Sequence, residues 1–159
     1  MRDYLFILDS VKEPIKNEND LLTVKLNLGR VKSGIARKTL EIGSTNYYKR
    51  YAKQFIYGKQ NFFNGGFGII PNDMNGKFSS GDVPSLNIKN IDKNFLYFNM
   101  SRPDYWKSKE SYSTGTGSKC IHEKTLLNFD INVTQNCKEQ EKIRNIFSCL
   151  EKQITFNEY

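Results

Sequence analysis

The sequence predicts an α+β (α/β) fold: a compact globule with a twisted, mostly β core and short helices, followed by one amphipathic C-terminal helix. Up to residue 136, apolar and polar residues alternate in short runs that glycine or proline interrupts, which is typical of short strands. Beyond residue 136 the apolar residues recur every three or four positions, which predicts a helix. Hydrophobic residues make up 38% of the 159-residue chain, enough to bury a core.

Alternation places the strands and turns in order along the chain. The first expected strand covers residues 22–28 and ends at a turn at Gly29, and residues 30–54 are expected to be loops with room for one short element. Further strands are expected at 54–57, within 65–71 after a glycine-rich turn, at 85–88 and, last, at 126–133. Turns are expected at 75–76 and 79–82.

The helical regions are fewer. Residues 95–100 are compact and aromatic and fit either a short helix or a strand, with a helix favoured if Asp92 caps it. After Asn136 the spacing of apolar residues is 4-3-4 with charged residues between them, which predicts a coiled-coil-type seam. A lone helix cannot bury such a seam, so it must pack on its own domain or on a helix of another chain. The seam residues are Ile143, Ile146, Phe147, Leu150 and Ile154.

Composition excludes several classes of protein. No apolar run approaches the length of a membrane span, and the apolar run near the N-terminus is too short for a signal peptide, so we expect a cytoplasmic protein. The three cysteines are odd in number and form no C-x-x-C, which favours reduced thiols. With His122 as its single histidine, the chain has no multi-histidine metal site, and we predict no metal.

Charge gives the strongest functional signal. The chain carries a net charge of +7, which favours a polyanionic partner, most often nucleic acid. Between residues 25 and 59 there are nine Lys or Arg and one acid, Glu41, with tyrosines and amides between them. Such residues bind phosphates and base edges, although a solvated basic loop beside core tyrosines would look similar. The candidate DNA contacts here are Lys25, Arg30, Lys32, Arg37, Lys38, Tyr47, Tyr48, Lys49, Arg50, Lys59, Asn61 and Asn64.

A second candidate contact is the Ser/Thr/Gly-rich loop within 111–119. It lacks the order of a nucleotide-binding P-loop, because Lys119 is followed by Cys120. Its hydroxyls and backbone N–H groups suit a DNA phosphate, and a plain flexible turn is the alternative. The residues in question are Ser113, Thr114, Thr116, Ser118 and Lys119.

Signals for catalysis are weak. The glycines of 65–68 loosely resemble a loop that binds S-adenosylmethionine, but no N-P-P-[YF] or D-P-P-[YF] motif follows. Pro103-Asp104 lacks the downstream acid and lysine of a nuclease, and Cys120 beside His122 is more simply incidental. We therefore expect no catalytic residues.

Several fragments, taken in order, resemble one family. They are Leu22-Thr23-Val24-Lys25-Leu26-Asn27, Gly43-Ser44-Thr45-Asn46-Tyr47-Tyr48, Tyr57-Gly58-Lys59-Gln60-Asn61, Gly65-Gly66-Phe67-Gly68-Ile69-Ile70-Pro71, Ser79-Ser80-Gly81-Asp82-Val83-Pro84-Ser85 and Gly115-Thr116-Gly117-Ser118-Lys119-Cys120-Ile121-His122. The chain resembles the specificity (S) subunit of Type I restriction-modification systems. It departs from the family pattern at Cys120, where a basic residue is common, at Glu123, where proline is common, and before the helix, where prolines are usual.

The resemblance implies a target recognition domain at 1–136 and the start of a conserved spacer helix at 137–159. Such a half-subunit would read one half of a split double-stranded DNA sequence. It would pair through its helix with a second copy or with a DNA methyltransferase (modification) subunit. It would also direct a restriction/translocase subunit to the target. S-adenosylmethionine, ATP and Mg²⁺ would belong to those partners, in the bacterial cytoplasm at the nucleoid. The alternative is a protein-interaction module that has lost independent DNA binding.

Overall fold

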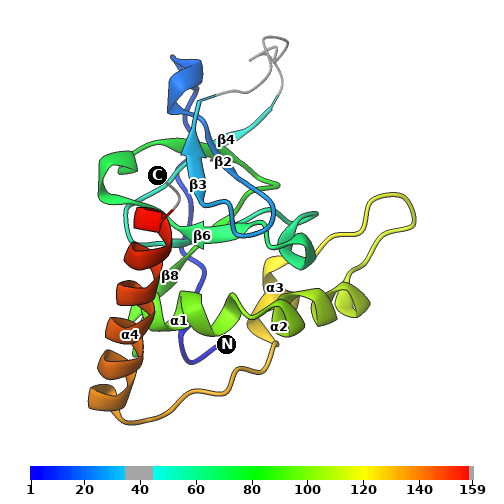
Figure 1. The fold of residues 1–159 in the computed structure, drawn as a ribbon. Helices are drawn as coiled ribbons and strands as arrows, with labels where there is room; N and C mark the ends of the chain where they lie inside the picture. Colours follow the sequence, from blue (N-terminus) through cyan, green and yellow to red (C-terminus); the bar gives the residue numbers. More distant parts are fainter. Residues whose placement is uncertain (35–44, 158–159) are drawn as a thin grey trace.

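The computed structural model describes residues 1–34 and 45–157, and of these all side chains except those of 154–157. A four-stranded antiparallel sheet lies at the centre, in the order β1 (Leu5–Phe6), β8 (Ser85–Ile88), β5 (Phe55–Tyr57) and β6 (Phe67–Ile69). Two further antiparallel pairs lie beside it in Figure 1: β2 (Leu22–Val24) with β3 (Val31–Ser33), and β4 (Tyr47–Lys49) with β7 (Phe78–Ser80).

The helices gather on one side of the central sheet. They are α1 (Lys93–Met100), α2 (Pro103–Ser108), α3 (Glu123–Leu127) and the long α4 (Cys137–Asn157), which runs upright beside α1 in Figure 1. Four 3₁₀ turns complete the described elements: η1 (Glu18–Asp20), η2 (Phe62–Asn64), η3 (Asn72–Met74) and η4 (Lys109–Tyr112). The mixed α+β fold is the predicted one.

Strand β5 is buried on both of its faces. Phe55 and Tyr57 face the main core, which includes Leu96 of α1, and Ile56 faces a second cluster that contains Leu22 and Val31. All three β5 residues are less than 1% exposed, because the β2–β3 pair covers the side of the sheet that the helices leave open. A strand that is covered on both faces has a continuous apolar sequence, as residues 55–57 do.

Helix α1 resolves the choice left open for residues 95–100. The Asp92 carboxylate accepts hydrogen bonds from the backbone N–H groups of Asn94 (3.0 Å) and Phe95 (2.9 Å), so the cap that favoured a helix is present. Pro103 does more than end α1, because it occupies the first turn of α2, where a missing N–H leaves no bond unmade.

Four expectations about strands and turns are wrong. The strand expected at 22–28 ends at Val24, because the chain turns at Asn27 and Leu28, whose φ angles are positive. The stretch 30–54 contains two strands, β3 and β4, rather than one short element. Ser79 and Ser80 belong to β7 and not to a turn.

The fourth error concerns residues 126–133, expected to be the last strand. They form the end of α3 and then an extended segment with no strand partner among the described residues. The alternation of apolar and polar residues does correspond to alternating burial, since Phe129 is buried and its neighbours are exposed. However, side chains of other segments, and not a neighbouring strand, bind the backbone oxygens here. Asn99 Nδ2 donates to Asn132 O (2.7 Å) and the Tyr105 hydroxyl donates to Asp130 O (3.0 Å). A period of two shows an extended backbone and does not by itself show a sheet.

Among the described residues, no helix combines the length and the hydropathy needed to cross a bilayer.

Candidate nucleic-acid interface

The β2–β3 hairpin ends in a tight turn. Gly29 N donates to Leu26 O (3.0 Å), and Asn27 and Leu28, the two residues between them, have φ angles of 52° and 60°. Two successive positive φ angles are characteristic of type I′ hairpin turns, in which asparagine is favoured and leucine is unusual. Across the base of the turn, Lys25 N donates to Arg30 O (3.1 Å), so these two basic residues stand opposite each other.

The turn is fixed to the 58–66 segment by main-chain bonds. Asn27 N donates to Asn64 O and Leu28 N donates to Gly65 O, both at 2.9 Å. Gly65 is required at this contact, because its φ is +71° and a Cβ there would lie 3.1 Å from Leu28 N. The Leu28 side chain packs against the main core. The hairpin turn is therefore held at a defined place rather than projecting freely.

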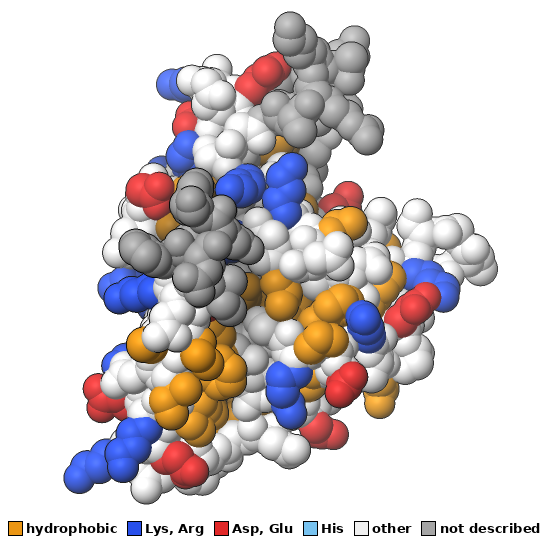
Figure 2. All heavy atoms as spheres, viewed as in Figure 1, with side chains coloured by type: hydrophobic (Ala, Val, Ile, Leu, Met, Phe, Trp, Pro, Cys, Tyr) orange, Lys and Arg blue, Asp and Glu red, His pale blue; other side chains and the backbone are white. Residues whose placement is uncertain are grey.

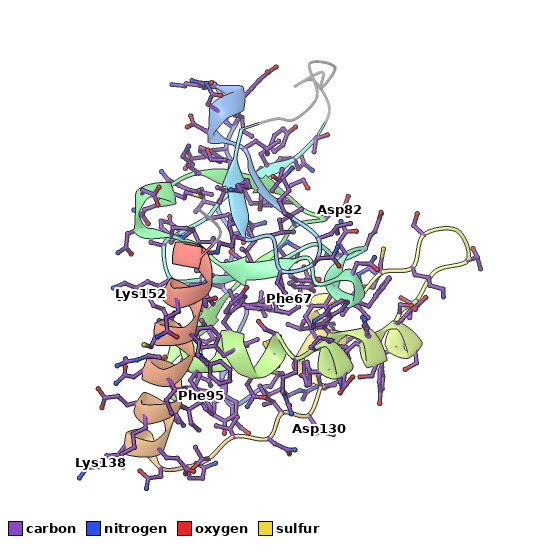
Figure 3. All side chains as sticks on the ribbon, viewed as in Figure 1. Phe67, Asp82, Phe95, Asp130, Lys138 and Lys152 are labelled. Atoms are coloured by element: carbon purple, nitrogen blue, oxygen red, sulfur yellow. The ribbon has the colours of Figure 1, made fainter. Side chains whose placement is uncertain are left out.

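The same 58–66 segment also holds the loop 113–120. Ile121 N donates to Lys59 O (2.8 Å), and Thr114 and Cys120 exchange two backbone hydrogen bonds of 3.0 and 2.9 Å that close the loop. Lys59 N in turn donates to Asp82 O (2.8 Å), and Asp82 is labelled on this side of the molecule in Figure 3. The two groups of candidate DNA contacts thus share one supporting segment.

The cations on this surface differ in their partners. Lys59 lies 3.2 Å from Glu123, Lys119 lies 2.7 Å from Glu110, and Lys49 lies 3.9 Å from Glu13. In the part of the chain that the structure describes, no carboxylate lies within ion-pair distance of the exposed residues Lys25, Arg30 and Lys32. Figure 2 shows blue side chains gathered over the β2–β3 hairpin. We call Lys25, Arg30 and Lys32 the hairpin cations.

Two candidate contacts lie inside the protein. Tyr47 is 4% exposed and Arg50 is 3% exposed, so neither presents its side chain to solvent as a DNA contact would require, and the prediction for these two residues is wrong. The Arg50 guanidinium donates to Ser79 Oγ (2.7 Å), to Ser10 Oγ (3.1 Å) and to two backbone oxygens (3.4 Å each). Burial lowers the pKa of Arg50 to about 10, with the Glu123 charge opposing the change, so Arg50 remains a cation at neutral pH.

The remaining candidates are at least partly accessible. Tyr48, Asn61 and Ser113 are half-buried, and Asn64, Thr114, Thr116 and Ser118 are exposed. Arg37 and Lys38 lie outside the described residues. The sequence reasoning overlooked Leu26 and Asn27, which form the exposed tip of the turn. Asn27 followed by Gly29 was an available turn signal, but the alternation through residue 28 concealed it.

A second surface lies between α1 and α4. The rings of Phe98 and Phe147 stack with centroids 5.1 Å apart, and Arg144 Nη1 lies 3.3 Å from the Asp92 carboxylate. Beside these contacts an apolar groove of about 650 Å³ remains open, and Figure 2 shows it as an orange patch. We call it the α1–α4 groove. Its apolar lining is Phe95, Phe98, Ile143, Phe147 and Leu150.

The predicted seam of α4 is therefore only partly covered by its own domain. Ile143 is half-buried, whereas Phe147 is 44%, Leu150 47% and Ile146 59% exposed. The side chain of Ile154 lies outside the described residues. Figure 3 labels Phe95 on the groove side of α4 and Lys138 and Lys152 away from it.

The two surfaces meet at the C-terminal part of α4. Arg30 and Lys32 line a hollow of about 260 Å³ together with Ser148 and Glu151 of α4. Among the described residues no group of three or more His, Cys, Asp or Glu is placed to hold a metal ion.

No protein-family model and no curated protein sequence matches the chain. Among solved structures, the crystal structure of the HsdS subunit from Thermoanaerobacter tengcongensis has a similar fold, with a TM-score of 0.64 and 13% sequence identity. The similarity covers 93% of this chain and 40% of that chain. The chain thus shares its fold with one part of a longer HsdS subunit.

Proposed function

We propose that this protein is a sequence-specific double-stranded DNA-binding domain that acts as a half specificity subunit of a Type I restriction-modification complex. The fold similarity to an HsdS subunit over nearly the whole chain supports this role. In this role the domain reads one half of a bipartite target and brings the modification and restriction/translocase subunits to it. It works in the bacterial cytoplasm, at the nucleoid.

The observation that carries the proposal is the set of hairpin cations. Lys25, Arg30 and Lys32 are exposed on a turn that main-chain bonds hold in place, and no described carboxylate pairs with them. Unpaired cations on a rigid support suit DNA phosphates, because binding releases counterions without breaking an existing ion pair. Lys59 and Lys119 are paired within the chain and contribute less to that release.

The domain itself is proposed to be non-catalytic. Methyl transfer and cleavage, with S-adenosylmethionine, ATP and Mg²⁺, would belong to the partner subunits. The α1–α4 groove would receive a helix of a second copy or of the methyltransferase subunit.

The test of DNA binding is selection from a pool of randomised duplexes at two salt concentrations. We expect an enriched short motif and an affinity that falls steeply with salt. Salt-sensitive binding without enrichment would mean that the domain needs its partner to read sequence. Absence of binding at low salt would refute the proposal.

A pair of triple variants tests the hairpin cations directly. Changing Lys25, Arg30 and Lys32 to Gln should lower the slope of log affinity against log salt by about 2 to 3 units, roughly 0.9 for each phosphate that the variant no longer neutralises. The matched control changes three exposed lysines elsewhere, Lys89, Lys138 and Lys142, to Gln and removes the same net charge. Equal reductions in the two variants would show that net charge alone, and not the hairpin, determines binding.

The α1–α4 groove favours a second candidate function. An open apolar groove beside a helix is suited to protein contacts, so the chain would act as an assembly module without its own DNA binding. Under this alternative the selection gives no binding, while the helix still associates.

A further inference from the structure

The tip of the β2–β3 turn places one exposed apolar side chain beside two exposed amides. Leu26 is 47% exposed, and the amides of Asn27 and Asn64 are exposed beside it. Lys25 and Arg30, which directly follow β2 and precede β3, flank this group. Other apolar residues of the hairpin, such as Leu22 and Val31, are buried, so the exposure of Leu26 does not follow from a general lack of core space.

The tip is also held in an unfavourable backbone conformation. Leu28 has a φ of 60° and Arg30 a φ of 68°, and a left-handed conformation costs a residue with a side chain roughly 1–2 kcal/mol. The bonds to Asn64 O and Gly65 O and the packing of Leu28 against the core maintain it. A backbone strained in this way and fixed at several points is typical of functional sites, where it sets the direction of exposed side chains.

We propose that this tip is the base-reading element of the domain and that it reads an A·T base pair in the major groove. This rests on the proposed function. Leu26 would contact the thymine 5-methyl group, and the amide of Asn27 would bind the adenine edge. Lys25 and Arg30 would bind phosphates on the two sides of the groove, whose width admits a two-stranded ribbon.

The chemistry of the tip selects this base pair among the four. Carboxamides pair with adenine N6 and N7, while an arginine or lysine at the tip itself would favour guanine. The exposed apolar group beside the amides has one apolar partner on the base edges of the major groove, the thymine methyl. The cations stand at the base of the turn, where they reach the DNA backbone rather than the groove floor.

The experiment first selects a motif with the wild-type chain and then repeats the selection with two variants. Asn27→Gly keeps the positive φ of the turn and removes the amide, and its control is Asn90→Gly, at an exposed asparagine with a φ of 58° elsewhere. We expect the motif of Asn27→Gly to lose its preference at one A·T position by about tenfold, within the range for removing one bidentate base pairing. The motif of the control should be unchanged.

The contact of Leu26 is tested by replacing each thymine of the selected motif with uracil, which removes only the methyl group. For the wild-type chain, one replacement should weaken binding about fourfold, the value of one methyl group removed from water. For Leu26→Ala the same replacement should have no effect, and for the control Leu8→Ala, at a leucine of the N-terminal segment that is 55% exposed, it should weaken binding as in the wild type.

The outcomes separate the two proposals. If the wild-type chain binds no DNA, the proposed function fails, and this inference fails with it. If the wild type selects a motif but Asn27→Gly selects the same one, or uracil weakens Leu26→Ala as much as the wild type, only the inference is overturned. Binding without any enriched motif also overturns the inference, while leaving DNA binding itself intact.

Discussion

Arg50 shows how a basic residue in a DNA-binding candidate segment can serve the fold. Its guanidinium joins three parts of the chain: Ser10 of the N-terminal segment, Ser79 of β7 and the turn that follows β7. No described carboxylate forms an ion pair with it, and its burial is offset by hydrogen bonds to neutral groups together with the more distant charge of Glu123. Basic residues of the same segment can therefore differ in role: Arg50 is buried and supports the fold, whereas Arg30 is exposed.

The first prediction follows from this network. Arg50→Met should lower the free energy of unfolding by about 2 kcal/mol, because Ser10 and the carbonyl groups lose a buried donor. The matched control is Arg30→Met, at an exposed arginine, which should change stability by no more than about 0.5 kcal/mol. Urea denaturation at pH 7 measures both. Equal effects would contradict the structural role of Arg50.

Tyr57 gives a prediction about pH. Its hydroxyl donates to Ile121 O (3.0 Å) in the core, and burial raises the pKa of this phenol well above its usual value near 10. The unfolded chain then loses this proton at a lower pH than the folded chain does. The contribution of Tyr57 to stability is complete below pH 10 and is lost as pH rises above it.

Tyr57→Phe should cost about 1 kcal/mol at pH 7, the value of one hydrogen bond, and the gap to the wild type should close between pH 10 and pH 11. The measurement is urea denaturation at both pH values, with Tyr51→Phe at an exposed tyrosine as the control at pH 7. A gap that stays constant with pH would show that the buried phenol does not govern alkaline stability.

At the scale of elements, Asp92 connects α1 with α4. One carboxylate oxygen caps α1 at Asn94 N and Phe95 N, and the other lies 3.3 Å from Arg144 of α4. Nearby, the buried Gln140 donates to Thr134 O (2.8 Å). The position of α4 on its own domain therefore depends on polar contacts at its N-terminal half and on Phe147 further along.

Two substitutions separate the functions of Asp92. Asp92→Asn keeps the cap and removes the ion pair, whose members are about 30% exposed, so it should cost about 0.5 kcal/mol. Asp92→Ala also removes the cap and should cost about 1 kcal/mol more. Thermal or urea unfolding measures both. If Arg144→Met has its full effect in the Asp92→Asn background, the ion pair does not stabilise α4.

Local sequence patterns predicted an element well where its formation does not depend on segments that are distant in the sequence. The buried run at 54–57, the cap at Asp92 and the seam after Asn136 each gave the observed element. The strand expected at 126–133 failed because alternation cannot reveal whether another strand lies alongside. The hairpin cations, predicted from their charge to contact DNA, are exposed, and the contact itself stays a prediction. Arg50 was placed wrongly because its burial comes from the pairing of β4 with β7, which are far apart in sequence.

At the scale of the whole molecule, two unlike surfaces lie on different parts of one globule. The hairpin cations are on the β2–β3 pair, and the apolar groove lies between α1 and α4 (Figure 2). The hollow that Arg30 and Lys32 share with Glu151 is where they approach each other. Arg30 and Lys32 do not line the groove, but Phe98 and Glu151 line both the groove and this hollow, so the two surfaces are adjacent.

The groove leads to a prediction about association. We expect the chain to associate through α4 in a concentration-dependent way, and Leu150→Glu should abolish this, because a carboxylate cannot be buried unpaired in an apolar interface. Lys138→Glu, on the opposite side of α4, is the control and should associate as the wild type does. Sedimentation over a concentration series measures it. A wild-type chain that stays monomeric throughout would contradict this prediction.

The way the hairpin turn is attached has a consequence for evolvability. Its bonds to the 58–66 segment join main-chain atoms, N–H of Asn27 and Leu28 to the carbonyls of Asn64 and Gly65. Such bonds are the same for almost any side chain, so the geometry depends on Gly65, on Gly29 and on the anchoring of Leu28. The exposed positions 26 and 64 can thus vary without loss of the scaffold, whereas position 27 keeps a preference for asparagine or glycine because its φ is positive. If the tip reads DNA as proposed, single substitutions there would change the target preference while stability is retained.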